Sequence, residues 1–278
     1  MNACFNQESQ KLNPIYLMQF LIPAESFIAM RGTLMVILMK ISSLSFDLDN
    51  SSLSSDKKIP YLSFLSYTID PSSIVFGSWV SYTHFVDSLK LQTLKEELYD
   101  LLYGSLLISL SLIFVIYSSC VVNELFSGIF FWHQFGVAQS FRFSHYFICW
   151  LSAGVLRISG INTGFISEWY RIEWPRSLVD VVISWNIPMH NYLHKYVFVE
   201  AKRFGTSVAV FITYFISSFL HGINFQISAV LLSLGFYTFA EAKIRNRLSK
   251  RLNCCIGARK CRENCKHMYK EVRVLNYG

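Results

Sequence analysis

Charged residues are scarce in this 278-residue chain: they make up 15% of it, against 53% hydrophobic and 16% aromatic residues. Soluble globular domains carry about 25% charged residues. This shortage excludes an ordinary soluble domain and favours a protein that the lipid bilayer surrounds. Backbone groups in lipid must be satisfied internally, so we predict an all-α fold, a polytopic transmembrane helical bundle.

Two long stretches lack charged side chains almost completely. Leu101 to Val122 is an uncharged run long enough to cross a membrane on its own. Phe204 to Ala240 contains 37 residues, and His221 is its only residue that titrates near neutral pH. This second stretch is too long for one span and fits two short ones, with a break at His221 to Asn224. An ionisable residue within a membrane segment is by default a candidate functional residue.

Three other segments are expected to be broken or interrupted helices. Asn13 to Phe46 contains Arg31 and Lys40, which predicts a tilted or protein-buried helix. We expect both cations to extend to a membrane interface, with steering of CoA phosphates as the alternative. Ile59 to Tyr82 contains Asp70-Pro71, so two half-helices or a re-entrant pair are expected. The aromatic stretch Phe130 to Trp150 indicates an interfacial helix, followed by a span that ends near Arg157.

The net charge of +7 is concentrated at one end of the chain. Residues 241–278 hold eleven Lys or Arg and three Glu, a net charge of +8 that leaves −1 for the other 240 residues. By the positive-inside rule this basic, cysteine-containing segment is expected to be cytosolic, which directs the His221 turn toward the opposite, luminal half. Nucleic-acid binding is the competing reading, but orientation already accounts for the charge. Residues 1–11 show no pattern of a cleavable signal peptide.

The seven cysteines do not form a recognisable metal site. Cys254, Cys255, Cys261 and Cys265 lie in the basic segment with His267 nearby, but they lack the usual two-pair zinc spacing. A cytosolic location disfavours disulfides, and free or lipidated thiols are the alternatives. His190 and His194 share a helical spacing without a third ligand, so no metal is expected.

The sequence Trp185-Asn186-Ile187-Pro188 is the second chemical feature. Proline should break the helix directly after Asn186 and present its amide side chain, and broken membrane helices commonly line binding sites. The alternative is that Asn186 only satisfies backbone groups that the break releases. No internal repeat is visible, which disfavours a transporter.

The segment WNIPMHNYLHKYVF and the later segment SSFLHGINFQISAVLLSLGFYTFAE together resemble the asparagine-to-histidine core of the membrane-bound O-acyltransferases. Further similarity lies at residues 30–49, 74–82, 173–186 and 243–252, and so covers most of the chain. Within the family, the chain looks most like enzymes that attach a monounsaturated fatty acyl group to a serine of Wnt proteins. The resemblance implies one domain over residues 1–278, expected to be incomplete at both ends.

The resemblance further implies that His221 is the catalytic base and Asn186 its partner. Trp185 and Tyr192 are candidates to line the acyl or CoA path, although packing explains them equally well. Fatty acyl-CoA would be the co-substrate, a Wnt-type secreted protein the acceptor, and the endoplasmic reticulum membrane the location, with no metal or redox cofactor. The alternatives are acylation of a lysophospholipid or diacylglycerol, and an inactive fragment or binding protein.

Overall fold

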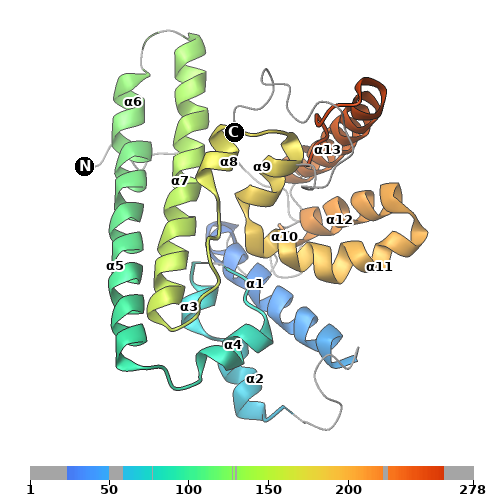
Figure 1. The fold of residues 1–278 in the computed structure, drawn as a ribbon. Coiled ribbons are helices and arrows are strands. Elements are labelled where there is room, and N and C mark those ends of the chain that lie inside the picture. Colours follow the sequence, from blue (N-terminus) through green and yellow to red (C-terminus); the bar gives the residue numbers. More distant parts are fainter. Residues whose placement is uncertain are drawn as a thin grey trace. The chain divides into compact units, whose positions relative to one another are not determined.

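The computed structural model describes residues 24–49, 59–76, 78–126, 128, 130–221 and 225–259, a part of the chain that is helical and contains no strand (Figure 1). The chain divides into two compact units, Met1–Ile166 and Ser167–Gly278. The all-α fold is therefore confirmed. The prediction of one domain over residues 1–278 includes segments outside the described residues and stays a prediction.

In the first unit, the predicted break at Asp70-Pro71 is confirmed. Helix α1 spans Ala24–Asp49, α2 spans Tyr61–Thr68, and α3 spans Pro71–Ile74. Asp70 is the N-cap of α3, and its carboxylate accepts hydrogen bonds from the Ser72 amide at 3.4 Å and the Ser72 hydroxyl at 2.7 Å. A carboxylate at this position satisfies amide groups that the helix itself leaves unbonded.

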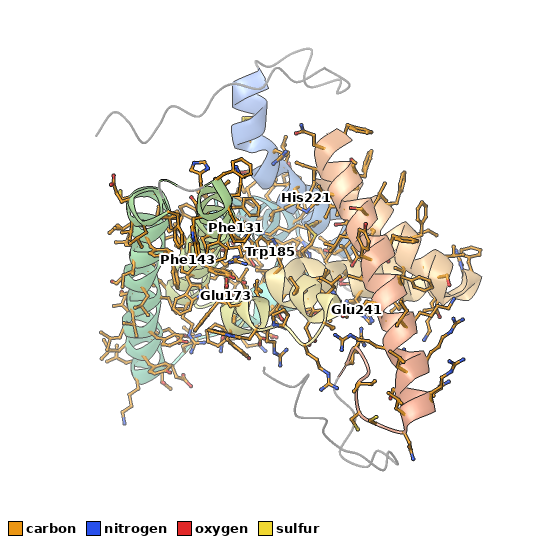
Figure 2. The ribbon with its side chains drawn as sticks, turned by 90° about the horizontal axis from the view of Figure 1, so that it is seen from above. Phe131, Phe143, Glu173, Trp185, His221 and Glu241 are labelled. Atoms are coloured by element: carbon orange, nitrogen blue, oxygen red, sulfur yellow. The ribbon has the colours of Figure 1, made fainter. Side chains whose placement is uncertain are left out.

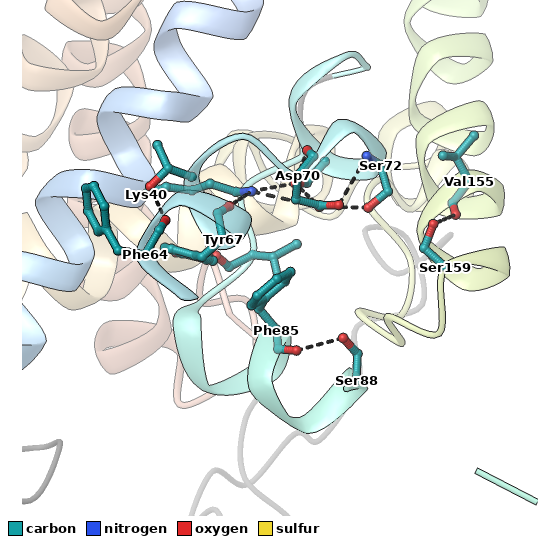
Figure 3. Close-up of polar contacts among 12 residues, drawn as sticks. Lys40, Phe64, Tyr67, Asp70, Ser72, Phe85, Ser88, Val155 and Ser159 are labelled. Carbon is teal, nitrogen blue, oxygen red and sulfur yellow. Dashed lines mark hydrogen bonds and ion pairs between the residues drawn. The ribbon is translucent and has the colours of Figure 1, made fainter. Parts of the chain in front are cut away.

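Lys40 does not extend to an interface as the sequence led us to expect, since its side chain is fully buried (Figure 3). Its Nζ donates to the Tyr67 carbonyl at 2.7 Å and to Ser73 Oγ at 2.6 Å. Ser73 Oγ in turn donates to Asp70 Oδ2 at 2.5 Å, and the ammonium lies 3.9 Å from the same oxygen. The expectation was wrong because α2 and α3 supply hydrogen-bond acceptors for the ammonium group. The residue pattern of α1 does not show which segments pack against it.

A long antiparallel helical pair forms the rest of the first unit. After α4 (Tyr82–Ser88), α5 (Leu94–Ile116) continues through a π-helical turn (Tyr117–Val121) and a short α6 (Val122–Leu125). Helix α7 (Phe130–Ile158) packs along α5. The span predicted at Leu101 to Val122 overlaps a continuous helical stretch, Leu94–Val121, that is long and apolar enough to cross a membrane. The predicted helix end near Arg157 is confirmed, but the expected division into an interfacial helix and a separate span is wrong, because α7 is continuous.

Glycine makes the close approach of α5 and α7 possible. A Cβ atom on Gly104 would lie 2.8 Å from the Gly154 carbonyl oxygen, and one on Gly154 would lie 2.8 Å from the Gly104 carbonyl oxygen. Farther along the pair, Ser140 Oγ donates to the Ser118 carbonyl at 2.8 Å. Small residues at such a crossing let two helix backbones approach closely in lipid.

The second unit is built from short broken helices and one long one. Helices α8 (Trp169–Glu173), α9 (Leu178–Trp185) and α10 (Ile187–Leu193) are followed by a π-helical turn (His194–Phe198), α11 (Val199–Ala201) and a 3₁₀ turn (Lys202–Phe204). Helices α12 (Thr206–Leu220) and α13 (Phe225–Leu252) confirm the predicted break in the 37-residue stretch. Only the first is short: α13 has 28 residues and continues into the basic segment.

Candidate functional site

Asn186 separates α9 from α10 and has extended backbone angles, φ −147° and ψ 90°. Its Oδ1 accepts a hydrogen bond from the Met189 amide at 3.0 Å, and its carbonyl accepts from the His190 amide at 2.9 Å. Pro188 lies in the first turn of α10, where a missing N–H costs nothing. The asparagine is therefore the N-cap that the Asn-Ile-Pro sequence predicts.

Capping also fixes the orientation of the side-chain amide. An N–H donor requires an acceptor, so the oxygen of Asn186 faces Met189 and the NH₂ group points away from α10. Within the described parts of the chain this NH₂ group makes no hydrogen bond, and the residue is only partly buried. The two interpretations of Asn186 are thus compatible, because one atom caps the helix while the other remains able to donate.

His221 directly follows α12 and is its C-cap, with φ −73° and ψ −4°. Its backbone amide donates to the Ser217 carbonyl at 3.1 Å, which ends the helix at the predicted position. The residue is partly buried, and Figure 2 marks its side chain. Gly222 to Asn224, the rest of the predicted break, lie outside the described residues.

A helical hairpin lies between Asn186 and His221, and each of the two residues lies on an arm far from the turn. The hairpin turns at Gly205, whose φ of 105° favours glycine, and α12 packs back against α11 and the π-helical turn (Figure 1). Asn186 precedes Gly205 by 19 residues and His221 follows it by 16. At about 1.5 Å per residue, the two residues lie about 29 Å and about 24 Å along their arms from the turn.

The two candidate path residues have different surroundings. Tyr192 is buried in α10, and its ring lies 5.3 Å from that of Tyr196, centroid to centroid. Trp185 is the last residue of α9 and is partly buried, directly before Asn186 (Figure 2). Position alone favours Trp185 over Tyr192 as a residue beside the Asn186 amide.

The expected absence of a metal site stays a prediction, although the described residues contain no cluster of three His, Cys, Asp or Glu side chains. The rings of His190 and His194 lie 5.9 Å apart, centroid to centroid, on one face of the hairpin. Cys261, Cys265 and His267 lie outside the described residues. Cys254 and Cys255 are both buried.

The basic segment folds back onto the start of α9, a contact that sequence reasoning missed. After α13 ends, Asn253 adopts a positive φ of 50° and the turn Cys254–Ala258 reverses the chain. Arg176 donates to the Cys255 carbonyl at 2.5 Å and to the Gly257 carbonyl at 3.1 Å. Ser177 Oγ donates to the Ala258 carbonyl at 2.9 Å. We call this docked turn, residues 254–258, the clasp.

Glu241 of α13 also binds the start of α9. Its carboxylate accepts from the Leu178 amide at 2.8 Å and from Arg245 Nε at 2.7 Å. The start of α9 is thereby fixed to both α13 and the clasp, and α9 carries Asn186 at its other end. In the sequence, this contact is marked only by the family resemblance of residues 173–186. The type of residue at Arg176 and Ser177 does not by itself indicate a contact or a function.

The chain is similar to known proteins over most of its length. A model of the membrane-bound O-acyltransferase family matches residues 4–251. The chain is 34% identical to the protein-serine O-palmitoleoyltransferase porcupine of Mus musculus and to that of Homo sapiens, over 89% of this chain and 60% of each relative. The Anopheles gambiae protein of the same name is 35% identical over 90% of this chain and 57% of its own length. The chain thus spans less than two thirds of these relatives.

Proposed function

The chain belongs to the membrane-bound O-acyltransferase family, and we propose that it transfers a palmitoleoyl group from acyl-CoA to a serine hydroxyl of a Wnt-type secreted protein. The relatives carry this reaction type in their name, protein-serine O-palmitoleoyltransferase. The observation that supports the proposal in this chain is that Asn186 caps α10 through Oδ1, which leaves its NH₂ group able to donate, while His221 ends α12 of the same hairpin.

His221 acts as the general base in this proposal. A serine hydroxyl is a poor nucleophile while protonated, and a neutral imidazole can accept its proton during attack. The serine oxygen attacks the thioester carbonyl carbon, the carbon–sulfur bond breaks, and the CoA thiolate leaves and takes up a proton. General-base assistance of this kind is worth about 10²–10⁴-fold in rate.

Asn186 stabilises the developing charge. Its NH₂ group, held outward by the bond from the Met189 amide to Oδ1, donates to the thioester carbonyl oxygen as that oxygen becomes an anion. The N-cap fixes the donor before substrate arrives, so no reorganisation is needed during attack. Transfer is direct, without a covalent acyl-enzyme, and no metal or redox cofactor takes part.

In the proposed topology the two substrates reach the site from opposite sides of the membrane. The basic end of α13 and the clasp face the cytosol by the positive-inside rule, and acyl-CoA enters from there. The Wnt-type acceptor approaches from the lumen of the endoplasmic reticulum, the side to which the His221 turn points. Water exclusion by the surrounding membrane protein suppresses hydrolysis of the thioester.

The acceptor is tested directly in microsomes that contain the chain. Labelled palmitoleoyl-CoA is offered with a Wnt-derived serine peptide, the same peptide with alanine at the acceptor position, or a lysophospholipid. Transfer to the serine peptide alone is the expected result. Transfer to the lysophospholipid instead would replace the protein acceptor with a lipid one, and absence of transfer to all three would contradict the proposal.

A further inference from the structure

Two serine hydroxyls near Asn186 are buried without a hydrogen-bond partner in the described part of the protein. Ser167 is 2% exposed and Ser184 is 1% exposed. The Oγ atoms of both have no acceptor or donor among the described residues. A buried hydroxyl without a partner costs about 1–3 kcal/mol, so its presence requires an explanation.

Ser184 differs from most helical serines of this chain. Ser111 and Ser118 donate to the carbonyl three residues earlier, and Ser109, Ser144 and Ser159 donate to the carbonyl four residues earlier. This back-bonding is the ordinary way to satisfy a hydroxyl inside a helix. Ser184 lies in the last turn of α9 and makes no such bond. Its hydroxyl is therefore not used by its own helix.

The two serines lie beside one another. The Glu168 amide donates to the Ser184 carbonyl at 3.0 Å, which fixes the segment containing Ser167 against the end of α9. Ser184 precedes Asn186 by two residues. Ser184 therefore lies in the last turn of α9, which leads into Asn186, and the backbone next to Ser167 is bonded to it.

The other end of α9 is the end that the clasp and Glu241 hold. Eight residues of α-helix are about 12 Å long. In the proposed topology the clasp faces the cytosol, so Ser184 and Ser167 lie between the cytosolic side and Asn186. A bound acyl-CoA places its pantetheine arm in this interval, because the arm connects the thioester to the phosphates outside.

We propose that the hydroxyls of Ser184 and Ser167 bind the amide groups of the pantetheine arm of acyl-CoA. The arm carries two amides, each with one N–H donor and one carbonyl acceptor, and a serine hydroxyl both donates and accepts. The apolar acyl chain offers neither. The inference rests on the proposed function and assigns the donor substrate's polar arm to two residues that the resemblance did not single out.

If the serine hydroxyls stabilise the fold, their removal should have the opposite effect on thermal stability from the effect expected if they bind a ligand. A hydroxyl that stabilises the fold has a partner there, and its removal lowers thermal stability. A hydroxyl kept for a ligand is unsatisfied in the free protein, so Ser184→Ala leaves thermal stability unchanged or raises it. The same substitution weakens ligand binding about three- to tenfold, the effect of one lost neutral hydrogen bond.

The experiment measures equilibrium binding of two unreactive ligands to the purified chain in detergent. One is the thioether analogue of palmitoleoyl-CoA, and the other is a simple alkyl thioether with the same acyl chain and no pantetheine. The variants are Ser167→Ala, Ser184→Ala and, as a matched control, Ser233→Ala, whose exposed hydroxyl back-bonds to the Val230 carbonyl at 2.8 Å. Thermal stability is recorded for each.

We expect Ser167→Ala and Ser184→Ala to weaken binding of the CoA analogue only, with thermal stability retained, and Ser233→Ala to change neither ligand. Unchanged binding of the CoA analogue by both variants, or an equal loss for both ligands, would overturn the inference. Loss of thermal stability without loss of binding would overturn it as well. If the wild-type chain binds neither ligand, the proposed function itself fails, which separates the two outcomes.

Discussion

The Oδ1 atom of Asn186 accepts a hydrogen bond from the Met189 amide at 3.0 Å, so the residue that starts α10 is also the proposed donor to the substrate. One half of the side chain is structural and the other half is available for chemistry. Substitutions that change only one of the two atoms therefore separate the roles.

Asn186→Asp keeps the cap, because a carboxylate at a helix N-terminus accepts the Met189 amide and interacts favourably with the helix dipole. It removes the NH₂ donor. We expect thermal stability close to that of the wild type and a turnover rate about 10²–10³-fold lower, the usual effect of losing one such donor. Asn186→Ala should lose about 1 kcal/mol of stability as well. Activity of the Asp variant near the wild-type level would restrict Asn186 to capping.

Gly104→Ala and Gly154→Ala test the close crossing of α5 and α7. The added Cβ would lie 2.8 Å from a backbone carbonyl oxygen in each case, so the helices must separate. We expect a loss of about 1–3 kcal/mol, measured as thermal stability in detergent. Gly32→Ala in α1 is the matched control, because nothing lies within 4 Å of its added Cβ. Equal stability of all three variants would rule out a tight crossing.

Lys40→Met tests the buried ammonium. The substitution leaves Asp70 and the Tyr67 carbonyl without their cation, and breaking one partner of such a buried pair costs about 3–5 kcal/mol. Thermal stability should recover in part when Asp70→Asn is added. Lys90→Met is the control, since Lys90 is 74% exposed in its ion pair with Asp87 and should change stability little. A Lys40 variant as stable as the control would show that this contact is dispensable.

Arg176→Ala tests the clasp. Loss of the bonds to the Cys255 and Gly257 carbonyls should release the turn and expose the thiols of Cys254 and Cys255. Maleimide labelling, mapped by mass spectrometry at these two cysteines, should be slow in the wild type and faster in the variant. Arg247→Ala, which removes an exposed arginine of α13, should label like the wild type. Fast labelling of the wild type would contradict a docked clasp.

Three helix breaks were predictable from the sequence because they depend on local chemistry, whereas the break expected within α7 does not occur. Pro71 and Pro188 determine two of the breaks. The third lies at His221, because the apolar stretch around it is too long for a single span. The partners of Lys40 and Arg176 were not predictable, because they are backbone carbonyls distant in sequence and any residue type supplies them. The sequence indicated Asn186 and His221 individually. Their positions along the hairpin depend on the turn at Gly205.

The central claim is that His221 is the base for acyl transfer, and its direct test is transfer of labelled palmitoleoyl-CoA to the Wnt-derived serine peptide in microsomes. The wild-type chain is compared with His221→Ala at matched expression and with His133→Ala, which removes an exposed histidine of α7. We expect transfer by the wild type and by His133→Ala, and a loss of about 10²–10⁴-fold in His221→Ala. Equal transfer by all three would contradict it.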